Sequence, residues 1–158
     1  MKQLTQAACF ALMLAASPVF GHGDEASHHG NSGHGASIGK PGELARVSRT
    51  IELEMNDAMR FVPSTVSVKR GDTIRFLVKN SGRLKHEMVL GSIAELKAHA
   101  ELMRRFPEMV HADPNQVVVD PGQTGELIWQ FAKTGKVDFA CLQPGHFEAG
   151  MKGKISVK

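Results

Sequence analysis

The sequence predicts an all-β sandwich with one α-helix inserted near residues 93–106. Short stretches of alternating apolar and polar residues, separated by Gly and Pro, recur from residue 46 to the C-terminus. One segment interrupts them with helical spacing instead. The chain has 158 residues, 42% hydrophobic and 22% charged, which indicates one globular domain with a tail. It is too short for a multidomain oxidase.

The predicted strands follow one another with turns between them. Ile51, Leu53 and Met55 alternate with glutamates, and Val66 and Val68 alternate with polar residues. The remaining apolar faces are Ile74, Phe76 and Val78 after a Gly71-Asp72 turn; Met88 to Leu90; Leu127, Trp129 and Phe131; Val137, Phe139 and Cys141; and Ile155 and Val157. Several short alternating strands with intervening turns are typical of an antiparallel sandwich or barrel.

The helix has a start signal and a stop signal. Ser92 is a candidate N-cap, and Glu95 three residues later completes a capping box. Ile93, Leu96, Ala100 and Met103 fall at helical spacing, and Pro107 follows the last of them.

The first 21 residues predict a secretory signal peptide. A positive Lys2 precedes the apolar run Ala7 to Ala16, which ends at Ser17-Pro18. The run is too short for a membrane span, which needs roughly 20 residues. We therefore expect export to the periplasm, cleavage after Gly21, and no membrane span.

Cleavage would leave a single cysteine. Cys9 lies in the signal peptide, so only Cys141 remains in the mature chain. A lone cysteine cannot form an internal disulfide in an oxidising compartment, and a free thiol there is open to oxidation. The sequence therefore raises the question of what occupies Cys141.

Residues 22–45 predict a disordered, His-rich tail. The segment is rich in Gly, Ser and His and has too few apolar residues to offset its ordering entropy. Its spaced imidazoles indicate metal binding, and the alternative is a polar spacer. The candidate ligands are His22, His28, His29 and His34, where His22 would carry a free amine after cleavage.

Residues 141–151 place a thiolate, an imidazole and a thioether close together. Cys141, His146 and Met151 lie in a Gly/Pro-containing loop between two predicted strands. A thiolate with imidazoles and a weak thioether selects copper over hard cations. His86, at the start of an apolar stretch, is the best candidate for the second imidazole. His99 and His111 are weaker candidates, because neither opens a predicted strand.

The strand pattern supports a metal at Cys141. Cys141 shares a face with Val137 and Phe139, so its sulfur should point into the sandwich. A buried thiolate is costly without a positive partner, and a metal ion supplies one. Taken singly, a Cys or a Met is more often a core residue and a His more often a loop residue. Together, in an exported chain, they predict a copper site.

From about residue 47 onward, the chain resembles the cupredoxins. The resemblance rests on Phe61-Val62-Pro63, the stretch from Val68 to Phe76, Asn80, His86 and the Cys-x4-His-x4-Met loop. It implies a Greek-key β-sandwich domain over residues 46–158, with type 1 copper held by His86, Cys141, His146 and Met151. The loop spacing is also similar to that of rusticyanin.

Other features resemble periplasmic copper-tolerance cupredoxins of the CopI type. These are the His-rich tail, the His86-Glu87-Met88 stretch and the helix followed by Met109 and His111. The resemblance implies a role in copper tolerance. One departure from azurin and plastocyanin is Glu87, which stands where they have Asn. Strand alternation should turn Glu87 away from the metal.

Two functions are consistent with these features. The first is copper tolerance, in which the protein binds copper and cycles it between Cu(I) and Cu(II). Further copper would then bind at the tail histidines or at Met109 and His111, and His99 and Met103 also share a helix face. The alternative for the methionines is core packing.

The second function is electron transfer by a soluble carrier between redox proteins, for which the tail has no obvious use. A single domain argues against an enzyme, and any cuprous oxidase activity would be secondary. With a net charge of +3 and no basic run, nucleic acid is not an expected partner. Nothing in the sequence requires more than a monomer.

Overall fold

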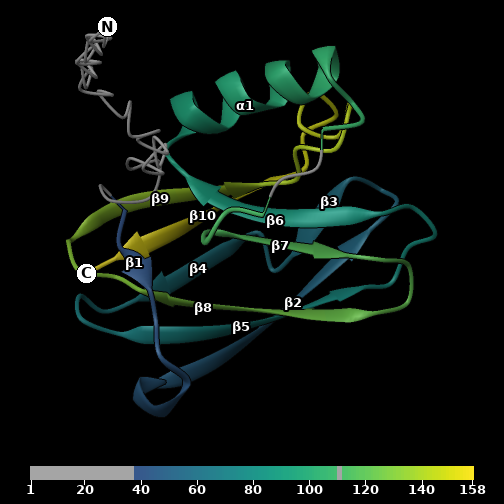
Figure 1. The fold of residues 1–158 in the computed structure, drawn as a ribbon. Coiled ribbons are helices and arrows are strands. Elements are labelled where there is room, and N and C mark those ends of the chain that lie inside the picture. Colours follow the sequence, from purple (N-terminus) through teal and green to yellow (C-terminus); the bar gives the residue numbers. More distant parts are fainter. Residues whose placement is uncertain (1–37, 110–111) are drawn as a thin grey trace, which may run out of the picture. The chain divides into compact units, whose positions relative to one another are not determined.

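The computed structural model describes residues 38–109 and 112–158, which form two β-sheets packed face to face, with a helix on the outside of one sheet (Figure 1). The predicted signal peptide, the predicted tail up to residue 37 and His111 lie outside the described residues. No helix in the described part of the chain is long and apolar enough to cross a membrane.

Each sheet has five strands in the described residues. The first sheet has the order β1 (Lys40–Pro41), β8 (Thr124–Gln130), β5 (Thr73–Asn80), β2 (Arg49–Asn56) and β3 (Arg60–Val62). The second has the order β4 (Thr65–Val68), β10 (Lys152–Val157), β9 (Gly135–Ala140), β6 (His86–Gly91) and β7 (Gln116–Val119). The predicted sandwich is therefore confirmed.

Two strand pairs are parallel, where the sequence predicted an antiparallel arrangement. β2 pairs with β5 in parallel, and β4 pairs with β10 in parallel. The chain passes from the first sheet to the second between β3 and β4 and returns at β5, so β5 lies beside β2 in the same direction. Parallel neighbours need such a crossover, whereas antiparallel neighbours can be joined by a hairpin. Alternation along one strand does not report the direction of its neighbour.

The main core lies between the two sheets and follows the predicted alternation. In β2, Ile51, Leu53 and Met55 are buried while the intervening glutamates are exposed. Phe61 of β3 and Phe139 of β9 meet edge to face across the sandwich, with ring centroids 4.9 Å apart. The main core thus packs the two sheets together, and it includes the predicted ligands Cys141 and Met151.

The helix α1 (Ile93–Arg105) begins where the sequence predicts. The Ser92 hydroxyl accepts a hydrogen bond from Glu95 N at 3.3 Å, and the Glu95 carboxylate accepts one from Ser92 N at 2.8 Å. The capping box is confirmed. Three of the four predicted apolar positions are buried, whereas Ile93 is half exposed.

A second, smaller core lies between α1 and the outer face of β6 and β9. Its buried residues are Val89, Leu96, Ala100, Met103, Ala140, Leu142 and Phe147. Figure 1 shows α1 on the side of this sheet that faces away from the other sheet. Both faces of β6 are consequently covered, and all six of its residues are buried.

The folded region begins before residue 46, inside the segment that the sequence assigns to the tail. β1 pairs with β8, Leu44–Arg46 form a short 3-10 helix (η1), and Ile38 is buried. The Trp129 indole N–H points at the Ile38 carbonyl at 3.5 Å. Gly39, at φ 141°, packs against Trp129 and Gln130, where a Cβ would overlap both. A two-residue strand shows no alternation, so the sequence pattern does not reveal it.

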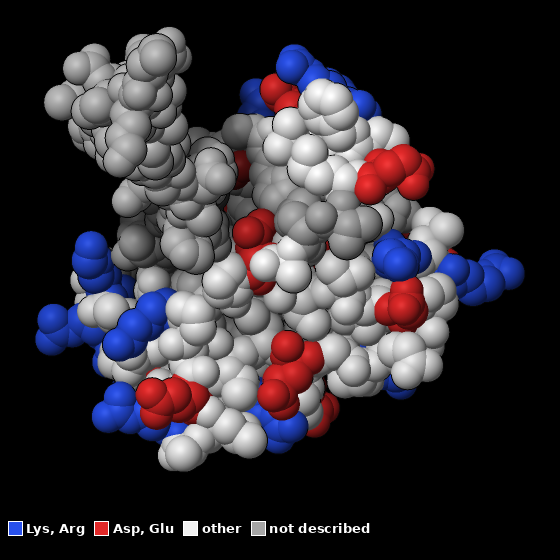
Figure 2. All heavy atoms as spheres, in the orientation of Figure 1, with Lys and Arg blue, Asp and Glu red and all other residues white. Residues whose placement is uncertain are grey.

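The surface carries charges of both signs. Figure 2 shows Lys and Arg side chains interspersed with Asp and Glu over the face it presents, without a stripe of one sign.

Candidate metal centre

The candidate centre joins β6 to the loop that follows β9. His86 is the first residue of β6, and Cys141 comes directly after β9. His146 lies in the loop between β9 and β10. β6 and β9 are antiparallel neighbours, with Val89 opposite Ala140, and this pairing brings the two segments together.

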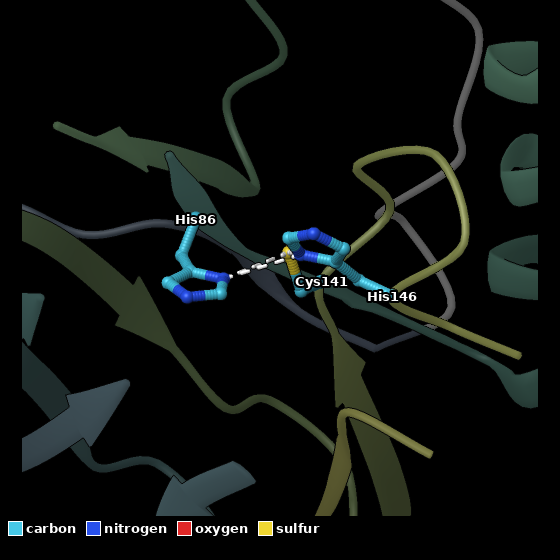
Figure 3. Close-up of side chains that lie close together, drawn as sticks. All are labelled: His86, Cys141 and His146. Carbon is cyan, nitrogen blue, oxygen red and sulfur yellow. Dashed lines mark hydrogen bonds between the residues drawn. The ribbon is translucent and has the colours of Figure 1, made fainter. Parts of the chain in front are cut away.

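Three donor atoms converge at this point (Figure 3). Cys141 Sγ lies 3.3 Å from His146 Nδ1 and 3.9 Å from His86 Nδ1. The two Nδ1 atoms are 3.2 Å apart. His86 and Cys141 have no exposed surface, whereas His146 is partly exposed.

These separations suit a single metal ion. With metal–nitrogen bonds of about 2.0–2.1 Å and a metal–sulfur bond of about 2.3 Å, donors in a trigonal plane stand roughly 3.5–3.8 Å apart. The observed distances of 3.2, 3.3 and 3.9 Å bracket that range. One thiolate and two imidazoles form a donor set that suits copper.

Backbone hydrogen bonds hold Met151 beside the other loop donors. Cys141 N donates to Met151 O at 3.1 Å, and Met151 N donates to His146 O at 3.0 Å. The Met151 side chain is fully buried in the main core, to which Cys141 also belongs. The loop therefore closes on itself and places the backbone of Met151 beside the backbone of Cys141 and His146.

Burial controls the state of the cysteine. It raises the pKa of the Cys141 thiol to about 12, and hydrogen bonds from the backbone N–H groups of Glu87 and Gln143 oppose the rise. The Glu87 N–H donates to Cys141 Sγ at 3.4 Å. Without a metal the thiol stays neutral near pH 7, so a bound cation must replace its proton.

The partly exposed imidazole is also perturbed. Burial lowers the pKa of His146, the electrostatic effect of the neighbouring His86 lowers it further, and Asp57 raises it. The neutral imidazole, which is the form that binds metals, is therefore favoured at His146.

Comparison with known proteins agrees with this geometry. Residues 47–158 match the model of the copper binding proteins, plastocyanin/azurin family. The chain belongs to this cupredoxin family. Copper is therefore the metal for which the three donors are suited.

Two copper-resistant cuproproteins named CopI are similar to this cupredoxin. That of Rubrivivax gelatinosus is 50% identical over 154 residues, covering 95% of this chain and 93% of the relative. That of Pseudomonas aeruginosa is 36% identical over 162 residues, covering 84% and 89%. Auracyanin of Roseiflexus castenholzii shares the fold, with a TM-score of 0.61 and 22% identity over 71% of this chain and 98% of auracyanin.

In this cupredoxin Glu87 is buried, although His86, the candidate ligand beside it, lies on the other side of the strand. Glu87 shares the outer face of β6 with Val89, as alternation predicted, but it is only 3% exposed. Its carboxylate accepts hydrogen bonds from Leu142 N at 3.0 Å and from Gln116 Nε2 at 3.3 Å. Glu87 thus anchors the residue that follows Cys141.

Sequence reasoning missed Asp57. Its Oδ1 lies 3.2 Å from His86 Nε2, and its carboxylate also accepts hydrogen bonds from Arg83 N and Leu84 N. The Arg83 N–H holds the pKa of Asp57 below its ordinary value. Asp57 follows β2, 29 residues before His86 in the chain, and no local pattern marks it.

The other candidate copper ligands that the structure describes are not part of this centre. His99 and Met109 line a groove of about 710 Å³ beside α1 and β6, together with Asp113. Met103 is buried in the smaller core, and Met55 and Met88 are buried in the main core. His22, His28, His29, His34 and His111 lie outside the described residues.

Proposed function

We propose that this protein is an exported, periplasmic type 1 copper protein that serves copper tolerance. It would bind one copper ion at His86, Cys141, His146 and Met151 and cycle that ion between Cu(I) and Cu(II). The observation that carries the proposal is the convergence of two imidazoles and a buried thiol on one point. The similarity to copper-resistant cuproproteins supports the physiological role.

The chain's own residues supply a rigid donor set. His86 and Cys141 adjoin paired strands and are fully buried, and the loop carrying His146 is closed by backbone hydrogen bonds. Bound copper supplies one-electron exchange. Donors that are fixed before binding move little when the oxidation state changes.

Replacement of the thiolate tests the ligand assignment. Cys141→Ser should abolish the strong thiolate-to-copper absorption of the copper-loaded protein. The matched control is His99→Gln, a histidine of the groove beside α1, which should keep the colour. An unchanged absorption band in Cys141→Ser would refute the assignment.

Additional copper at the tail or at Met109 and His111 is also part of the proposal. The test is the copper stoichiometry of two chains, which span residues 22–158 and 38–158. The shorter chain begins at residue 38 so that it keeps β1, which starts at Lys40. More copper in the longer chain supports binding by the tail histidines, whereas one copper in both removes that part. A Met109→Leu/His111→Ala variant of the shorter chain tests the remaining pair.

A deletion strain tests the role in the cell. Loss of copper resistance in that strain supports the proposal, as does recovery of the protein as a monomer from the periplasmic fraction of the parent strain. A second candidate is electron transfer, which the partial exposure of His146 favours because it gives a partner access to one ligand. A respiratory defect without added copper, and with copper resistance intact, would favour that candidate instead.

A further inference from the structure

Asp57 contacts the outward-facing side of the His86 ring. Asp57 Oδ1 lies 3.2 Å from His86 Nε2, while His86 Nδ1 faces His146 and Cys141. A neutral imidazole carries one N–H, so a hydrogen bond at Nε2 decides which nitrogen keeps a lone pair. The carboxylate can only accept, so Nε2 bears the proton and Nδ1 is left free.

The carboxylate is itself held in place. Its two oxygens accept hydrogen bonds from Arg83 N at 2.8 Å and Leu84 N at 3.2 Å, in the segment just before β6. Gly82 packs against it so closely that a Cβ there would overlap Asp57 Oδ1 and Cγ. Asp57 therefore links the turn after β2 to the start of the strand that carries His86, and so joins the two sheets.

A carboxylate at this position acts on the metal through the ring. It orients the imidazole, raises its basicity and adds a negative charge near the ion. A negative charge stabilises Cu(II) more than Cu(I), because Cu(II) carries one more positive charge.

We propose that Asp57 is a positioning residue for His86 that sets its tautomer and lowers the reduction potential of the copper centre. This rests on the proposed function, in which His86 is a copper ligand. The role is separate from that of Glu87, which contacts the cysteine side of the centre.

The test is the reduction potential of copper-loaded Asp57→Asn, which removes the charge and keeps a similar shape. Cu(II) affinity should fall about 10–100-fold, the usual cost of losing such a partner. Cu(I) affinity should fall less, and each tenfold difference between the two losses raises the potential by about 59 mV. The matched control is Glu126→Gln, which removes one charge from an exposed ion pair with Arg75 and should leave the potential unchanged.

Gly82→Ala provides a second variant with no change in charge. The new Cβ would overlap the Asp57 carboxylate in its present place, so we expect the carboxylate to shift, its contact with His86 to weaken and the potential to rise as in Asp57→Asn. A third readout needs neither copper nor a variant. Nitrogen NMR of the wild-type apoprotein should show His86 protonated at Nε2, and protonation at Nδ1 would overturn the proposal.

The outcomes separate this proposal from the one on which it rests. An intact absorption band and an unchanged potential in Asp57→Asn would overturn the role of Asp57 and leave the copper centre standing. Retention of the band in His86→Ala would instead refute His86 as a ligand. Circular dichroism of each variant establishes that the sandwich is intact, and the NMR result decides the case if a variant does not fold.

Discussion

Glu87→Ala should destabilise the fold by removing the acceptor for the backbone next to Cys141. The Glu87 carboxylate accepts the Leu142 N–H at 3.0 Å, and Leu142 is only 1% exposed, so water cannot replace the lost acceptor. A hydrogen bond to a charged group is worth about 1.5–3 kcal/mol, and an orphaned buried donor costs about 1–3 kcal/mol. These two figures describe the same loss, so we expect about 2–3 kcal/mol.

The assay is urea unfolding of the apoprotein followed by circular dichroism. With a slope of about 1–3 kcal/mol per molar urea, the midpoint should fall by roughly 0.7–3 M at an unchanged slope. Glu87→Gln keeps an oxygen that can accept the Leu142 N–H, so its stability should stay within about 1 kcal/mol of the wild type. Equal losses in the two variants, or none in Glu87→Ala, would refute this reasoning.

Three further outcomes are expected. Burial raises the pKa of Cys141 to about 12, so above about pH 9 the unfolded thiol loses its proton while the folded thiol keeps it, and the apoprotein should lose unfolding free energy as pH rises. Urea titrations at about pH 8 and about pH 10 should show a smaller loss in Cys141→Ser, and equal losses would contradict this assignment. Met151→Leu conserves volume, so the apoprotein should lose less than about 1.5 kcal/mol while the spectrum and potential of the copper form change. An unchanged spectrum would argue against Met151 as a ligand. Gly39→Ala should lower the melting temperature, because Gly39 has a φ of 141° and its new Cβ would overlap Trp129. Gly122→Ala is the control, because Gly122 has a positive φ of 73° but open space for a Cβ. A larger fall in Gly39→Ala than in Gly122→Ala would measure the effect of the overlap.

The sequence predicted the features that depend on neighbours in the chain. Alternation placed Leu53 and Phe76 in the core, and the capping box at Ser92 located the start of the helix. The loop spacing from Cys141 to Met151, together with His86 at the start of an apolar stretch, identified the residues that the fold brings together. Each of these signals is a short pattern in the chain, although His86 lies 55 residues from Cys141.

The features that escaped prediction depend on distant parts of the chain. Asp57 is an isolated acid in a turn, and only the packing of the two sheets places it on His86. Alternation correctly turned Glu87 away from the main core, but it could not show that α1 packs on the outer face of β6 or that Leu142 and Gln116 contact the Glu87 carboxylate. The parallel pairing of β2 with β5 likewise depends on the path of the chain between the sheets.

The separation of His86 from Cys141 in the chain has a consequence for the order of events during folding. The two lie 55 residues apart, whereas Cys141, His146 and Met151 share one loop. Contacts between residues so far apart form late, because a long stretch of chain must first be ordered. An unfolded chain therefore offers copper one loop's thiol, imidazole and thioether, and the second imidazole arrives only when β6 pairs with β9. When the protein refolds in the presence of copper, the thiolate-to-copper absorption would then appear at the rate at which β6 pairs with β9. The absorption of the centre would therefore report the rate of this late folding step.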